Sequence, residues 1–116
     1  MDDSDPFNLA RFIAAQSGGV YETALAELKA GQNRSHWMWF IFPQHRDLGR
    51  SATARYYGLS GPAEAAAFVA HPLLGPRLRA SIRAMAAQLA TGRTAEQILG
   101  PVDALKYRSS MEMVGR

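Results

Sequence analysis

Polar residues around one aromatic segment are the part of this sequence best suited to bind a ligand. Arg34, Ser35 and His36 precede the run WMWFIF at residues 37–42, and Gln44 follows it. Arginine grips phosphate or carboxylate through paired N–H groups, and an indole ring offers a flat face for stacking. The combination predicts a pocket for a small anion such as a nucleotide or an ADP-ribose-like compound.

Three cations elsewhere in the sequence extend this predicted anion site. Lys106 and Arg108 are neighbours near the C-terminus, and Arg77 falls in the first turn of a predicted helix. A cation there opposes the positive end of the helix dipole, so we expect either a bound anion or a carboxylate such as Asp103 or Glu64 beside it. The predicted ligand-binding residues are Arg34, His36, Trp37, Gln44, Arg77, Lys106 and Arg108.

Each of these residues also has a structural interpretation. His36 could act as a general base near neutral pH, or its ring could bond a backbone carbonyl. Trp37 and Trp39 could stack on a ligand, although a core position is the commoner one for such large rings. Ser51 and the pair Ser109-Ser110 lack the glycines of a nucleophile elbow. The sequence therefore assigns no catalytic residue and leaves open whether the anion is bound or hydrolysed.

Residue types that are absent narrow the chemistry further. The chain has no cysteine, which excludes disulfides, thiolate-bound zinc, iron–sulfur clusters and thiol nucleophiles. Its histidines, His36, His45 and His71, lack a short metal-ligand spacing, and no glycine-rich phosphate motif is present. We therefore expect no metal site and no bound cofactor.

Charge and hydropathy restrict the expected partners. The net charge is +3, but the first 33 residues carry −3 and the remainder +6, an asymmetry that admits an anionic partner. Nucleic acid is not expected, because the 13 basic residues form no Lys/Arg run. The apolar run is far shorter than a membrane span, and the acidic start does not resemble a signal peptide. The sequence thus predicts a cytoplasmic protein without membrane contact.

Composition and helix-end signals predict an all-α fold, a single compact orthogonal bundle of about 5–7 helices over residues 1–116. Alanine is abundant, and Val and Ile are few. The expected helices are 6–17, 20–30, 62–70, 74–91, 95–99 and 105–113. The run at 37–42 is predicted as a buried helical turn or two, because no second strand is evident to pair with it.

The string from Arg34 to Gln44, RSHWMWFIFPQ, closely resembles the signature of an uncharacterised bacterial family, domain of unknown function 1810 (DUF1810), sometimes labelled calpastatin-like. Residues 5–16, residues 71–78 and the group from Asp103 to Ser110 match the family in the same order. The resemblance spans nearly the whole chain and implies an all-helical domain, without an established reaction, cofactor or catalytic residue. The calpastatin label does not fit, because a compact helical domain is unlike a disordered protease inhibitor.

The resemblance also bears on the C-terminus. Family members continue past the equivalent of Met113 with another aromatic-rich segment, whereas this sequence stops at Arg116. It therefore implies a shortened C-terminus, native or truncated, and an apolar face exposed where that segment would pack.

Two functions remain open at this stage. In the first, a domain binds or hydrolyses a nucleotide-like or phosphorylated anion, and the predicted residues converge on one pocket. In the second, a non-catalytic helical module binds a protein, or another copy of itself as a homo-oligomer, and the polar residues are dispersed around a flat apolar patch.

Overall fold

A computed structural model describes residues 5–114 and confirms the all-α fold that the sequence predicts. The helices in this part are α1 (Ala10–Gln16), α2 (Val20–Ala30), α3 (Met38–Ile41), the 3-10 turn η1 (Arg46–Leu48), α4 (Ala52–Tyr56), α5 (Pro62–Ala70), α6 (Leu74–Ala90), α7 (Ala95–Leu99) and α8 (Pro101–Val114). The eight α-helices of this part exceed the expected 5–7 because the short α4 was not predicted. Between residues 5 and 114, extended pairing is limited to one isolated bridge between His45 and Leu59.

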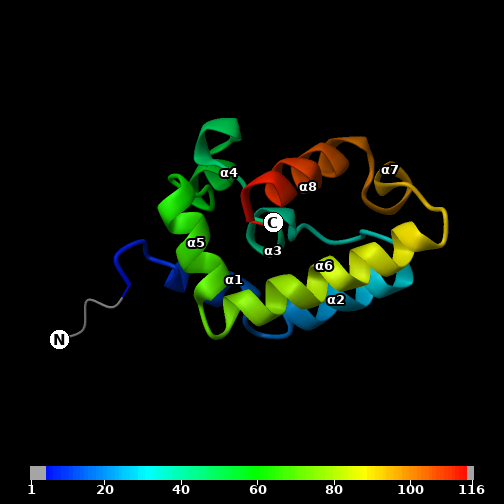
Figure 1. Cartoon of the computed structure of the whole chain (residues 1–116), viewed down its shortest axis with the longest axis horizontal. Helices are drawn as coiled ribbons and strands as arrows, with labels where there is room; N and C mark the ends of the chain where they lie inside the picture. Colours follow the sequence, from blue (N-terminus) through cyan, green and yellow to red (C-terminus); the bar gives the residue numbers. More distant parts are fainter. Residues whose placement is uncertain (1–4, 115–116) are drawn as a thin grey trace.

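The long helices enclose the aromatic run. α2 and α6 lie side by side and run in the same direction, and α8 returns above them (Figure 1). α5 crosses the start of α6 steeply, while α7 closes the opposite end of the molecule. The short α3 lies in the middle and contacts α1, α6 and α8. This arrangement covers both faces of the aromatic run, as its uniformly apolar character requires.

The aromatic run is part of the core and forms a helical turn, as predicted. Trp37 is 1% exposed, and Phe42 is completely buried. The Phe42 ring meets the edge of the Tyr107 ring with centroids 5.1 Å apart, and the Trp37 ring lies 6.3 Å away. Aromatic pairs in this range add to the stability gained from burial. The run therefore ties α3 to α8 and fixes where the residues after it emerge.

Local sequence signals set most helix ends where they were expected. Gly31 closes α2 with a left-handed backbone (φ 75°), a conformation that glycine adopts without steric cost. Thr94 and Gln97 form the predicted capping box at the start of α7. The prediction that α5 runs from Pro62 to the residue before His71 is also confirmed.

One predicted helix start is wrong. α1 begins at Ala10, not at Pro6, because Asn8 adopts a left-handed conformation (φ 54°) and interrupts the turn. The Asp5 carboxylate still caps the helix by accepting hydrogen bonds from the N–H groups of Leu9 and Ala10. α8 includes the predicted stretch 105–113 and begins at Pro101, since proline is well suited to the first helical position.

Candidate functional site

The first half of the signature string is organised by a carboxylate on α2. Glu27 accepts hydrogen bonds from the backbone N–H groups of Arg34 and Ser35 at 2.8 and 2.9 Å. It also accepts one from the Ser35 hydroxyl at 2.6 Å and one from the Trp37 indole N–H at 2.9 Å. One side chain therefore holds the segment that leads into α3.

The titration of Glu27 reflects these contacts. Burial alone would raise its pKa, but the hydrogen bonds from Ser35, Trp37 and the Arg34 backbone outweigh burial and lower the pKa from 4.5 to about 2. The side chain is therefore ionised at neutral pH. No local pattern in the sequence indicates this role, because Glu27 precedes its partners by seven or more residues and meets them only where the chain folds back after α2.

Three of the predicted ligand-binding residues lie in this segment, and their side chains diverge. The Arg34 side chain is exposed and donates to the Gln32 side-chain oxygen at 3.1 and 2.6 Å. The His36 ring is exposed, with its centroid 6.5 Å from that of Trp39. The Trp37 indole is buried and its N–H is taken by Glu27, so it offers no free face for stacking.

Arg77 lies apart from that segment. Its guanidinium stacks 4.6 Å above the Tyr21 ring, and it donates to the Gln16 side-chain oxygen at 3.3 Å. The expectation of a carboxylate partner, Asp103 or Glu64, is wrong, because both carboxylates bind other cations. The aromatic ring and the amide provide the negative electrostatic surface that a cation needs near a helix N-terminus.

The two cations predicted near the C-terminus both lie on α8, and each contacts a carboxylate. Arg108 contacts the Glu96 carboxylate of α7 at 2.7 Å on the surface. Lys106 lies 3.7 Å from Asp103 and 4.9 Å above the Trp39 ring. Of the predicted set, Gln44 and Lys106 line one concave surface, whereas His36 and Trp37 line a separate, smaller one beside the start of α2. The larger surface, with Gln44 and Lys106, is the candidate site.

That surface is a groove between α8, α3 and the segment from η1 to α4, with a volume of about 450 Å³. Its lining is mainly apolar and consists of Trp39, Gln44, Leu48, Gly49, Arg50, Ser51, Ala54, Val102, Leu105, Lys106 and Ser109. Three of these side chains are unusually exposed for their type, with Leu48 at 55% and Val102 and Leu105 each at 65%. Exposed apolar groups that adjoin one groove are typical of a binding surface.

Two hydrogen-bond donors in the groove lining are unused. The Trp39 indole N–H and the Gln44 amide nitrogen are buried, and neither has an acceptor within residues 5–114. Leaving a buried donor unpaired costs about 1–3 kcal/mol, so such groups are uncommon without a functional reason. Both donors belong to residues that line the groove, as does Lys106.

One wall of the groove belongs to a loop whose two ends are fastened together. The Arg46 N–H donates to the Leu59 carbonyl and the Leu59 N–H to the Gln44 carbonyl, each at 2.8 Å. Between these contacts, η1 and α4 pack mainly against each other and project from the helical body (Figure 1). The groove wall is therefore positioned by its ends more than by its own packing.

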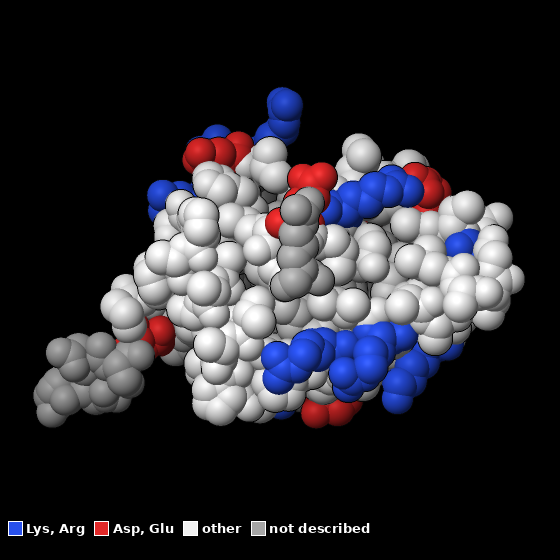
Figure 2. All heavy atoms as spheres, viewed as in Figure 1, with Lys and Arg blue, Asp and Glu red and all other residues white. Residues whose placement is uncertain are grey.

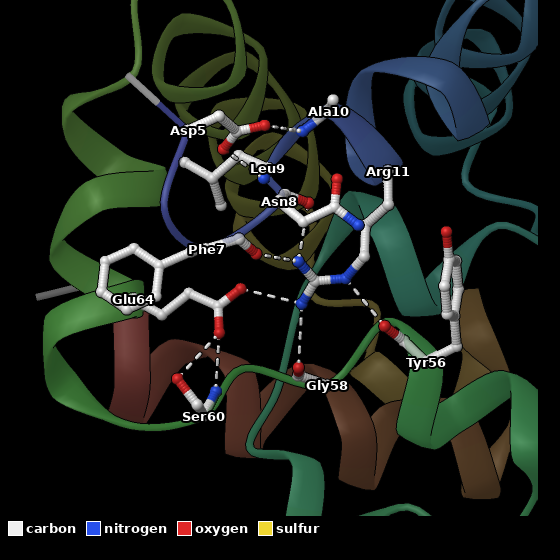
Figure 3. A network of polar contacts seen from close by, with 10 residues as sticks. All are labelled: Asp5, Phe7, Asn8, Leu9, Ala10, Arg11, Tyr56, Gly58, Ser60 and Glu64. Carbon is white, nitrogen blue, oxygen red and sulfur yellow. Dashed lines mark hydrogen bonds and ion pairs between the residues drawn. The ribbon is translucent and has the colours of Figure 1, made fainter. Parts of the chain in front are cut away.

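Arg11 of α1 holds the end of this loop from inside the protein (Figure 3). It donates to the carbonyls of Tyr56 at 2.7 Å and Gly58 at 3.0 Å, and its Nη2 lies 2.8 Å from the Glu64 carboxylate. Further hydrogen bonds reach the carbonyls of Phe7 and Asn8 within the same chain segment as α1. The Arg11 and Glu64 side chains are only 7% and 3% exposed, so the pair is a buried structural link. In the sequence, Arg11 belongs to the stretch 5–16 that resembles the family, but its spacing indicates no role for it.

The family model for DUF1810, described as a protein of unknown function, matches residues 6–116. The chain belongs to the DUF1810 family. It is similar to the crystal structure of the conserved hypothetical protein Rv1873 from Mycobacterium tuberculosis, with 48% sequence identity and a TM-score of 0.89 over 97% of this chain and 78% of that one. No curated protein matches this DUF1810 chain.

The described helices also limit what this DUF1810 chain can do at the groove. The groove lining contains no His, Asp or Glu side chain, so it provides no ready general base at neutral pH. Within residues 5–114, no cluster of three or more His, Asp or Glu side chains is placed to hold a metal ion. None of the helices in that range is long and apolar enough to cross a bilayer.

Proposed function

We propose that this DUF1810 domain is a cytoplasmic binding protein for a small anion with a flat or apolar body, which occupies the groove between α8, α3 and η1–α4. The observation that carries the proposal is the combination of unused donors and a cation, from Trp39, Gln44 and Lys106, with an apolar surface. Binding is favoured over hydrolysis because the lining lacks a general base.

The groove suits an anion with one charged end. Lys106 supplies a cation, and the Trp39 and Gln44 donors suit the oxygens of a carboxylate or phosphate. Val102 and Leu105 would cover the apolar body, at roughly 25 cal/mol for each Å² removed from water. A nucleoside monophosphate, with a flat base and one phosphate, belongs to this ligand class.

Thermal shift and calorimetry with matched compounds test the proposal. We expect 1-naphthyl phosphate, 1-naphthoate or AMP to raise the melting temperature, since a ligand that binds only the folded state stabilises it. Inorganic phosphate and neutral 1-naphthol each supply one half of the ligand and should give a much smaller shift. If no apolar anion raises the melting temperature more than both halves do, the proposal is wrong.

The two lysines of the chain provide a matched pair of variants. Lys106→Gln should weaken binding about tenfold or more, because it removes a charge-assisted contact. Lys29→Gln removes the same charge from α2, away from the groove, and should change the affinity less than twofold. Equal losses in both variants would show that net charge, and not the groove, governs binding.

A helical interaction module or homo-oligomer is the second candidate, favoured by the exposure of Val102 and Leu105. These residues are three apart on α8 and therefore share a helix face. In that case the mass in solution would rise with concentration, and Leu105→Asp would keep the protein monomeric. Apolar anions would then bind no better than their neutral counterparts.

A further inference from the structure

Basic side chains form a row along the α6 side of the molecule, below α8 in this view (Figure 2). The helix α6 carries Arg77, Arg79 and Arg83 and has no Asp or Glu in its 17 residues. Lys29 of α2 lies across from Arg83, because both line the shallow groove between α2 and α6. With Arg93, just after α6, these residues make up what we call the basic strip.

None of the five cations in the basic strip lies within 4 Å of a carboxylate in the described part of the chain. Their contacts are with neutral groups, such as the Val69 carbonyl for Arg79 and the Gln88 amide for Arg93. On α8, by contrast, Lys106 and Arg108 each lie within 4 Å of a carboxylate. The fold thus neutralises one basic helix and leaves the other available to an external anion.

The surroundings of the strip indicate the kind of anion. Protein partners usually bind through exposed aromatic or large apolar anchors. The large apolar side chains that are exposed within residues 5–114, Leu48, Tyr56, Val102 and Leu105, all lie outside the strip. Four of its five cations are arginines, whose planar N–H groups match phosphate oxygens. An acidic protein is therefore a poorer fit than a chain of phosphates.

Length and the absence of stacking groups narrow the partner further. A 17-residue helix is about 25 Å long, and duplex nucleic acid carries one charge per roughly 1.7 Å of its axis, so the strip can meet several phosphates. Single-strand binders add exposed aromatic rings on which bases stack. The aromatic ring at the strip, Tyr21, is half-buried and covered by Arg77.

We infer that the basic strip binds the phosphate backbone of double-stranded nucleic acid, independently of base sequence. The sequence contains no Lys/Arg run because α2 and α6 each contribute part of the strip, which exists only in the folded protein. This inference does not depend on the groove ligand, because the strip and the groove lining share no residue.

Fluorescence anisotropy with a labelled 20-base-pair DNA duplex tests the inference. We expect a dissociation constant of about 1–100 μM near physiological salt, as is usual for binding without sequence specificity. The logarithm of the affinity should fall linearly with the logarithm of salt concentration, with a slope of about −0.9 for each phosphate contacted. Two duplexes of unrelated sequence should bind equally.

Paired double variants separate the strip from overall charge. Arg79→Gln/Arg83→Gln should weaken duplex binding about tenfold or more and make the salt slope shallower by about 2. Arg46→Gln/Arg55→Gln removes the same charge from η1 and α4, outside the strip, and should cost less than threefold. All four side chains are exposed, so circular dichroism should show unchanged helix content.

Three results would overturn the inference. The first is no duplex binding even at low salt. The second is an equal loss in both double variants, which would indicate a general charge effect. The third is tighter binding of poly-glutamate than of the duplex at equal salt, which would assign the strip to an acidic protein.

Discussion

Replacing Glu27 by glutamine should destabilise the protein through the segment that leads into α3. The carboxylate accepts four hydrogen bonds from Arg34, Ser35 and Trp37. Three of the four donors, the N–H groups of Arg34, Ser35 and Trp37, bond the same oxygen, Oε1, and the Ser35 hydroxyl bonds Oε2. Glutamine has nearly the same shape and can keep its oxygen at the Oε1 position, with its NH₂ group facing the Ser35 hydroxyl. The change therefore removes the charge that strengthens these hydrogen bonds while leaving volume and helix propensity almost unaltered.

The lowered pKa gives the size of the effect. A pKa that falls from 4.5 to about 2 on folding corresponds to about 3 kcal/mol in favour of the folded, ionised state. Because the Glu27 side chain is partly exposed, solvent screening reduces this to about 1–2 kcal/mol. The contribution is complete above the unfolded-state pKa and is lost as the pH falls toward 2, with roughly two fifths gone by pH 3.5.

Urea denaturation of both proteins at pH 7 and pH 3.5 measures this contribution. Glu27→Gln should lower the free energy of unfolding by about 1–2 kcal/mol at pH 7, and the gap to the parent protein should narrow at pH 3.5. Near-ultraviolet circular dichroism should also change, because the acceptor of the Trp37 indole N–H loses its charge.

Glu22→Gln is the matched control, since Glu22 is an exposed residue of the same helix. It should cost less than about 0.5 kcal/mol, the size of a favourable helix-dipole contact at the surface. If the two variants are equally stable at pH 7, or if the Glu27→Gln deficit does not shrink on acidification, the reasoning is refuted.

Two further predictions concern the packing that supports the groove. Arg11→Met should lower the free energy of unfolding by about 3–5 kcal/mol in urea denaturation, because it leaves the buried Glu64 carboxylate without its cation. A loss below about 1 kcal/mol would contradict this role. Gly75→Ala should cost about 1–3 kcal/mol in the same assay, since its Cβ would lie 2.2 Å from the Val69 carbonyl oxygen where α5 crosses α6. Gly61→Ala, with open space around the added methyl group, is the control and should cost less than about 1 kcal/mol.

The candidate site was only partly predictable from sequence. The string from Arg34 to Gln44 was correctly predicted to border the site, because its aromatic density is uncommon and two of its residues, Trp39 and Gln44, line the groove. Its charged flank, however, faces Gln32 and solvent, while the groove borders its other end through Trp39 and Gln44. A short helical turn separates the two flanks and points them to different sides, which residue spacing alone does not reveal.

The features that could be predicted from sequence alone depend on local interactions. The all-α class and several helix ends depend on contacts between residues a few positions apart, as at the Thr94–Gln97 capping box and at Gly31. The start of α1 was mispredicted because Asn8 adopts a left-handed conformation. Its carbonyl accepts a hydrogen bond from Arg11, which also binds Glu64, 53 residues further along the chain.

Helix packing, which residue spacing does not reveal, sets which charges are neutralised and which remain available. Arg77 and Lys106 look equivalent in the sequence, yet one lies over Tyr21 on the α2–α6 face and the other over Trp39 in the groove. Electrostatic and stacking energies depend on distances in space, and these distances are set by how the helices pack rather than by how far apart residues are along the chain.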